Sequence, residues 1–203
     1  MNAARALALL RGLDAPAFTT GDAAARLRVA VPAASHTLRR LAQAGLVHSV
    51  RRGLWTLRES VEPLALVDFL TAPWPSYVSL QSALRFHGMI EQVPAVVYAV
   101  SLSRTRRIRT RFGTYSIHRI APEFFGGFEP SPRSGAKIAV PEKALLDVLY
   151  LSRGRSRLFA SLPELELPGG FRRRYAREWI AKIPSVRLRT LVTRRFEAIL
   201  PRR

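Results

Sequence analysis

Hydrophobic residues near the N-terminus recur every three or four positions, which is the period of an α-helix. Segment 2–11 has this spacing and is followed by Gly12, so it predicts a first helix. A second, short helix is expected to begin at Thr20, whose hydroxyl is suited to cap it. Pro32 then fits the first turn of a third helix, which Gly45 is expected to end.

The third predicted helix has one apolar side and one polar side. Ala34, Leu38 and Leu41 recur at three or four residues, so they are expected to share the buried side. The other side presents side chains of the kinds that read base edges or bind phosphates. We therefore predict that this helix contacts DNA through Ser35, His36, Arg39, Arg40 and Gln43.

A hairpin is predicted directly after these helices. The β-rich runs 46–50 and 54–57 flank a tip that holds Arg51, Arg52 and Gly53. Two helices joined by a tight turn and followed by a basic hairpin are the layout of a winged helix, whose recognition helix enters the major groove. The arginines of the tip would touch the DNA backbone. A plain three-helix packing unit with a solvated arginine side is the alternative that the sequence leaves open.

The chain is expected to divide into two domains. Segment 61–70 predicts another apolar helix, with Pro63 in its first turn. The run Ala-Pro-Trp-Pro at 72–75 is stiff and non-helical, so it marks the expected boundary. We predict a winged helix-turn-helix domain at residues 1–72 and a C-terminal domain with a basic surface at residues 76–203.

Strand-like patterns mark the first half of the second domain. A helix capped by Ser79 is expected to precede a buried strand at 95–102. Arg107, Arg109 and Arg111 then follow two residues apart, so a strand would place them on one face. A glycine turn and a return strand come next, which predicts a small antiparallel sheet.

The arginines of this predicted sheet have two readings. Either they form a phosphate-binding surface, or they charge an edge strand and so prevent aggregation. Like charges on one strand face repel each other, and a bound polyanion would offset that repulsion. We favour the binding reading, in which the contributing residues are Arg104, Arg106, Arg107, Arg109 and Arg111.

Helical patterns dominate the rest of the chain. Glu142 and Lys143 open a predicted helix in which Lys143 lies four residues before Asp147, so these two side chains can pair. The other elements expected here are a loop at 124–134, a strand at 138–140, a loop at 161–170, and helices at 171–183 and 186–200. The predicted fold class is α+β, with an N-terminal winged helix-turn-helix followed by a mixed α/β domain that has a small antiparallel sheet and terminal helices.

Composition points to a nucleic-acid partner. The 203 residues carry a formal net charge of +19, and lysine occurs only at Lys137, Lys143 and Lys182. Arginine therefore dominates, and its planar fork can bind a phosphate with two hydrogen bonds. An anionic membrane surface is a weaker reading of this charge. A GC-rich genome would also favour arginine codons regardless of function, so the arginine count alone decides nothing.

Several classes of protein are disfavoured. The chain has no cysteine, which rules out disulfides and thiol catalysis. No apolar run is long enough to span a bilayer and the N-terminus lacks a signal-peptide pattern, so we expect a cytoplasmic protein. The histidines show no metal-pair spacing, and we expect no metal and no cofactor. We also expect no catalytic residues, because Glu142-Lys143 lacks the preceding Asp of a nuclease motif. A nuclease-like enzyme is the alternative.

Two stretches of the second domain resemble a known family. They are Tyr-Val-Ser-Leu-Gln-Ser-Ala-Leu at 77–84, which leads to His87 and Gly88, and Ile-Ala-Val-Pro-Glu-Lys-Ala-Leu-Leu-Asp at 138–147. Together with the winged helix before them, they resemble the AbiEi antitoxins of bacterial toxin–antitoxin and abortive-infection systems.

The resemblance implies an autorepressor with two roles. Its winged helix would bind inverted repeats of double-stranded DNA upstream of its own operon, and its C-terminal domain would counter a nucleotidyltransferase toxin. Family members also place a positive C-terminal surface on DNA, and the run 104–111 lies where such a surface is expected. A solitary regulator without a toxin is the alternative. The sequence leaves the oligomeric state open, because two copies or one monomer per half-site would both suit inverted repeats.

Overall fold

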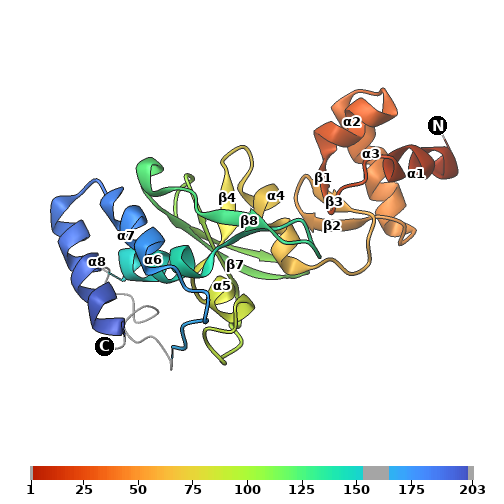
Figure 1. Ribbon diagram of the computed structural model, residues 1–203. Helices are drawn as coiled ribbons and strands as arrows, with labels where there is room; N and C mark the ends of the chain where they lie inside the picture. The colour runs from red at the N-terminus through yellow and green to blue at the C-terminus, as the bar shows by residue number, and fades with distance from the viewer. Residues whose placement is uncertain (1, 153–164, 201–203) are drawn as a thin grey trace.

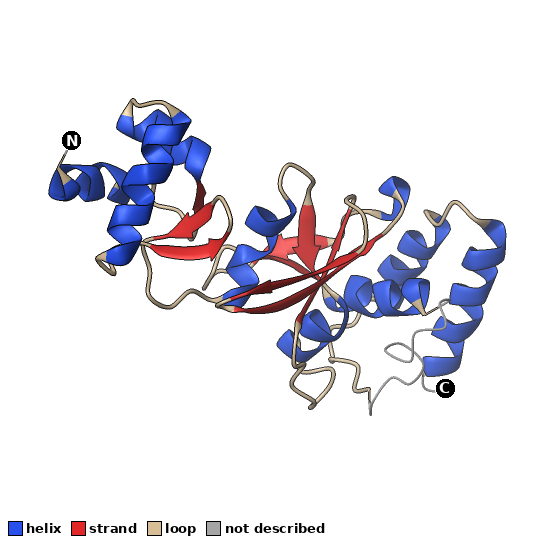
Figure 2. Ribbon diagram, turned by 180° about the vertical axis from the view of Figure 1, so that it is seen from behind, coloured by secondary structure: helices blue, strands red, loops and turns tan. Residues whose placement is uncertain are grey.

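The computed structural model describes residues 2–152 and 165–200. The molecule is elongated, with a small N-terminal part at one end, a large sheet in the middle and the last helices at the opposite end (Figure 1). Seen from behind, the two sheets are separate and each has its own helices (Figure 2). The predicted α+β fold class is confirmed.

The N-terminal part is a winged helix-turn-helix. Its helices are α1 (Ala3–Arg11), α2 (Thr20–Leu27) and α3 (Val31–Gln43). Strands β1 (Phe18–Thr19), β3 (Leu54–Thr56) and β2 (His48–Arg51) pair in that spatial order in an antiparallel sheet. The helices and this sheet enclose one apolar core, whose buried members are Ala6, Leu10, Phe18, Ala23, Leu27, Leu38, Leu41, Val47 and Trp55.

The cap of α2 lies one residue before the predicted one. Thr19, not Thr20, is the N-cap, and its hydroxyl accepts a hydrogen bond from the Asp22 N–H at 3.0 Å. The Asp22 carboxylate accepts one from the Thr19 N–H at 2.7 Å, which completes a capping box. The acidic residue three positions after Thr19 is the signal that selects it, and Thr20 is left free to bond elsewhere.

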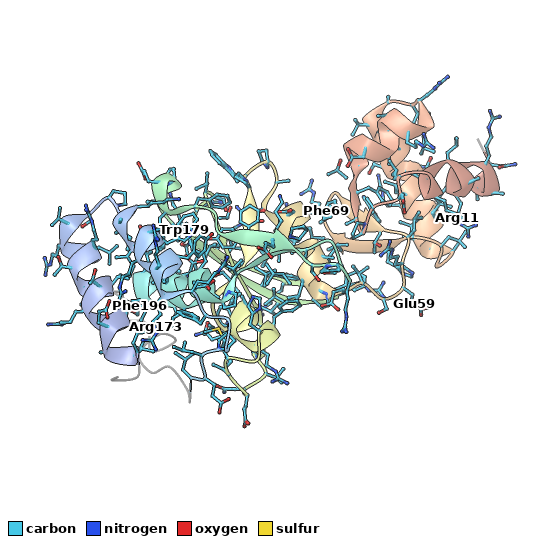
Figure 3. The ribbon with its side chains drawn as sticks, viewed as in Figure 1. Arg11, Glu59, Phe69, Arg173, Trp179 and Phe196 are labelled. Atoms are coloured by element: carbon cyan, nitrogen blue, oxygen red, sulfur yellow. The ribbon has the colours of Figure 1, made fainter. Side chains whose placement is uncertain are left out.

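Two short helices connect the parts, and they pack against the large sheet. They are η1 (Pro63–Leu66) and α4 (Val67–Thr71). The Tyr115 hydroxyl donates to the Pro63 carbonyl at 3.1 Å, and Asp68 pairs with Lys137 at 2.9 Å. This packing differs from our prediction, which grouped segment 61–70 with the winged helix. The connection around Glu59 leads from the wing to these short helices (Figure 3), and Ala17, Val50 and Leu54 of the winged part pack with the core of the second part.

The second part is built on a six-stranded sheet in the order β6-β7-β5-β4-β9-β8. β5 pairs with β7, and β4 with β9, in parallel, while the other pairs are antiparallel. The sheet is therefore larger than predicted and mixed rather than only antiparallel. Its strands are β4 (Ser76–Val78), β5 (Val97–Ser101), β6 (Arg106–Thr110), β7 (Gly113–Arg119), β8 (Phe128–Pro130) and β9 (Lys137–Ala139).

Helices pack around this sheet and complete its core. α6 contacts α5, α7 and α8, and most of its residues are buried. The predicted loop at 161–170 lies partly outside the described residues, and its described portion, 165–170, has no helix or strand. In the described part of the chain, none of the helices has the length and apolar character needed to cross a bilayer. The helices here are α5 (Leu80–Phe86), the 3-10 turn η2 (Pro122–Phe124), α6 (Pro141–Leu151), α7 (Arg173–Ala181) and α8 (Val186–Ile199).

Candidate nucleic-acid interface

We call the β2–β3 hairpin the wing. A groove of about 600 Å³ runs between α3 and the tip of the wing. The groove brings together Ser35 and Arg39 from α3 with Arg52 from the wing, three residues that the sequence nominates separately. α3 therefore lies beside the wing as a recognition helix does in a winged helix. The lining residues are Thr20, Val31, Pro32, Ser35, Arg39, Ser49, Arg52, Gly53 and Trp55.

Hydrogen bonds fix the wing to the start of α2. The Trp55 indole N–H donates to the Thr20 hydroxyl at 3.0 Å, and the Thr20 N–H donates to the Gly53 carbonyl at 3.0 Å. Gly53 has a φ of 79°, a conformation that glycine adopts without strain. The wing is thus tied to α2, which in turn packs against α3.

The two sides of α3 are as predicted. Ala34, Leu38 and Leu41 are buried, whereas His36, Arg39, Arg40 and Gln43 are exposed. Ser35 is half-buried at the groove wall. Within residues 2–152 and 165–200, no carboxylate pairs with Arg39, Arg40, Arg51 or Arg52. The charge on this side is therefore available to an external anion.

The arginines of β6 divide between two faces. Arg107 and Arg109 are exposed on the outer face, as predicted. Arg106 points the opposite way, and its Nη2 donates to the Leu70 carbonyl at 3.1 Å while its buried Nε has no partner. Burial lowers the pKa of the Arg106 guanidinium, and the charges of Arg51 and Arg104 lower it further.

Arg111 does not extend the row of Arg107 and Arg109, contrary to prediction. β6 ends at Thr110, so Arg111 lies in the turn before β7 and follows a different direction. Its Nη1 lies 3.0 Å from Nδ1 of His48, at the start of β2. The turn between β6 and β7 therefore touches the wing sheet, and Arg51 and Arg106 lie near enough to repel each other. Arg51, Arg106 and Arg111 thus lie at the junction of the two parts.

The second half of the chain holds a buried polar cluster that we call the Lys143 cluster, formed by Lys143, Asp147, Tyr77 and Ser79. The predicted Lys143–Asp147 ion pair is confirmed, and neither side chain is exposed. The hydroxyls of Tyr77 and Ser79 donate to Asp147 Oδ2 at 3.0 and 2.6 Å. Lys143 Nζ also donates to the Tyr77 hydroxyl at 2.8 Å.

Burial and the ion pair act in opposite directions on this cluster. Burial lowers the pKa of Lys143, and the Asp147 carboxylate opposes that shift. Burial raises the pKa of Asp147, whereas Lys143 and the two hydroxyls lower it. Ser79 is the N-cap residue of α5, as predicted, but its hydroxyl bonds to Asp147 instead of capping the helix. No local pattern in the sequence predicts this contact, because Ser79 and Asp147 lie 68 residues apart.

Glu142, the other acidic residue of the nuclease alternative, is also hydrogen-bonded within the fold. Its Oε1 accepts hydrogen bonds from the backbone N–H and the Nε of Arg172 at 2.7 and 3.1 Å. Burial alone would raise the pKa of Glu142, but the hydrogen bonds from Arg172 lower it below its ordinary value. Across the described segments, no group of three or more acidic or histidine side chains is arranged to hold a metal ion.

Comparison with known proteins identifies the first part of the chain. A family model described as a helix-turn-helix domain matches residues 6–50, which run from α1 into β2. Such domains bind DNA, so the match indicates DNA binding for the part of the chain that contains the groove. A search of the curated proteins found no match to this chain. The AbiEi resemblance of the second part is not shown by these comparisons and stays a prediction.

Proposed function

We propose that the protein is a transcriptional regulator that binds duplex DNA in a sequence-specific manner. α3 enters the major groove, and the wing contacts the adjacent backbone. The observation that carries this proposal is the groove, in which Ser35, Arg39 and Arg52 converge from two elements. Arginine and serine are donors that can contact both base edges and phosphates.

The charge distribution supports a nucleic-acid partner. The formal net charge is +19, and at the junction described above Arg51 of the wing lies near Arg106 of β6 while Arg111 contacts His48. Arg107 and Arg109 present a second exposed basic face, which would contact backbone phosphates without reading sequence. Repulsion among these groups makes a bound polyanion favourable, because its phosphates offset the like charges.

Binding without catalysis fits the acidic residues better than nuclease activity does. The carboxylate of Asp147 is fully buried and bonded to three side chains, and that of Glu142 is bonded to Arg172. A metal-dependent nuclease needs carboxylates that can reach a metal ion and a scissile phosphate. We therefore propose that the chain binds nucleic acid without cleaving it.

Selection from a random duplex library tests this function. The full chain, with magnesium present, is expected to enrich one consensus and to leave the recovered duplex uncut. Affinity for the consensus should fall steeply with salt, by ~100-fold between 50 and 200 mM for about four phosphate contacts. A library without any consensus, or reproducible cleavage, would overturn the proposal.

The finer proposal is an autorepressor that also acts as an antitoxin. The stretches that resemble the AbiEi antitoxins lie side by side: Val78 of β4 pairs with Ile138 of β9, and His87 Nε2 lies 2.7 Å from the Ala139 carbonyl. Their residues also form the Lys143 cluster, so the shared motif encodes the core of the second part. This supports a common fold, and through it the proposed repression of its own operon and the countering of a nucleotidyltransferase toxin.

Genome context and growth assays test the antitoxin role. We expect a nucleotidyltransferase reading frame beside this gene, and coexpression of the present chain should restore growth to cells that express that frame. The Arg39→Ala variant should still restore growth while losing repression of the operon, because Arg39 lines the groove, whose lining residues all belong to the winged part. A gene with no such neighbour, or coexpression that leaves growth arrested, would leave a solitary regulator.

A further inference from the structure

The first turn of α3 is apolar and exposed where it borders the groove. It consists of Val31, Pro32 and Ala33, all of them exposed, and 54% of the Val31 surface is accessible. The preceding residue, Ala30, supplies no side-chain cap, and the first turn has no acidic residue. Valine forms helices less readily than alanine does, so an exposed valine here adds nothing to the stability of α3.

The surroundings of Val31 point to DNA as the group that it meets. Val31 and Pro32 line the groove together with Ser35, Arg39 and Arg52, and no carboxylate is among its lining residues. The uncapped N–H groups at the start of α3 favour a nearby phosphate. An apolar contact enclosed by cations and free donors matches a duplex surface, whose only apolar major-groove feature is the thymine methyl group.

We propose that Val31 is a specificity-determining residue that contacts the 5-methyl group of a thymine in the major groove. The proposal rests on the DNA-binding function proposed above and extends it, because it states what one position of the bound sequence must be. The contact selects thymine over cytosine, which has no methyl group at that carbon.

A protein partner suits this patch less well. Within the winged part, the described large hydrophobic side chains that are exposed are Val31 and Leu46, and Leu46 follows the opposite end of α3. Stable protein interfaces bury about 1,200 Å² or more around an apolar centre. Val31, Pro32 and Ala33 make up only one exposed helical turn and offer no such centre, whereas one methyl group of a base is matched in size to the valine side chain.

Replacing thymine with uracil tests the contact, since uracil lacks only the methyl group. Each thymine of the consensus selected by the full chain is replaced in turn, and affinity is measured by fluorescence anisotropy at fixed salt. Wild-type protein is expected to lose about four-fold at one thymine per half-site, the factor that corresponds to ~0.8 kcal/mol for one buried carbon group. Val31→Ala is expected to bind the thymine and uracil duplexes equally at that position.

Leu46→Ala is the matched control, because it removes another exposed apolar side chain outside the groove. It should keep the wild-type preference for thymine, and thermal unfolding should show that both variants are folded. The proposal is wrong if Val31→Ala keeps the same thymine preference as wild type at every position. A selection that yields no consensus would instead overturn the DNA-reading function itself, so the two failures are distinguishable.

Discussion

Replacement of Lys143 with methionine is expected to lower the free energy of unfolding by about 3–5 kcal/mol. The methionine fills a similar volume but leaves the Asp147 carboxylate as an uncompensated charge in the core, where neither side chain of the pair is exposed. It also removes the donor to the Tyr77 hydroxyl. Urea denaturation followed by circular dichroism measures the loss.

Two further variants separate the buried charge from other effects of the substitution. Lys137→Met removes an ion pair with Asp68 whose side chains are each 40% exposed, so it should cost about 1 kcal/mol or less. Lys143→Met combined with Asp147→Asn leaves no charge in the Lys143 cluster and keeps an amide oxygen for Tyr77 and Ser79. It should therefore cost less than Lys143→Met alone. Equal losses for Lys143→Met and Lys137→Met would show that the Lys143 cluster does not stabilise the fold.

The sequence predicts the winged part well because each of its elements carries a local signal. Pro32 lies in the first turn of α3, Gly45 follows its end with a φ of 70°, and Gly53 lies at the wing tip. The periods of the apolar residues then decide which side of α3 is buried. The groove then forms where α3 and the wing, which follows α3 closely in the sequence, lie beside each other.

The second part is harder to predict from the sequence, because the order of its strands depends on contacts between residues far apart in the chain. β4 and β8 have three residues each, too few to show alternation, so the sheet was predicted to be smaller than it is. The opposite direction of Arg106 follows from strand alternation and is visible in the sequence. The contact of Arg111 with His48 depends on how the two parts meet, which no local pattern encodes.

Local spacing also predicts only part of the Lys143 cluster. A spacing of four residues predicts that Lys143 and Asp147 pair, but it says nothing of Tyr77 and Ser79, which lie about 70 residues earlier. These contacts join α6 to β4 and to the start of α5 through one carboxylate. Acidic residues within an apolar helix can thus be buried in ion pairs and hydrogen bonds, as Glu142 and Asp147 are.

Replacement of Arg39 with alanine is expected to lower affinity for the selected consensus duplex by about 5- to 150-fold, the range for a lost base contact of ~1–3 kcal/mol. Arg39 is exposed, and its guanidinium Nε donates to the Ser35 carbonyl of its own helix at a long 3.4 Å. Alanine is also a better helix former, so folding should be unchanged. Titrations of consensus and scrambled duplexes by fluorescence anisotropy give the loss and show whether it is specific.

Arg107→Gln is the control for charge, because Arg107 is also exposed but lies on β6 and does not line the groove. It should weaken consensus and scrambled duplexes by the same factor and reduce the salt dependence by about one phosphate contact. Arg39→Ala should instead lower the ratio of the affinity for the consensus duplex to that for the scrambled duplex, since the wild-type preference comes from base contacts of α3. If Arg39→Ala with Arg40→Ala still discriminates as wild type does, α3 is not the recognition helix, and the basic face of β6 becomes the site to examine.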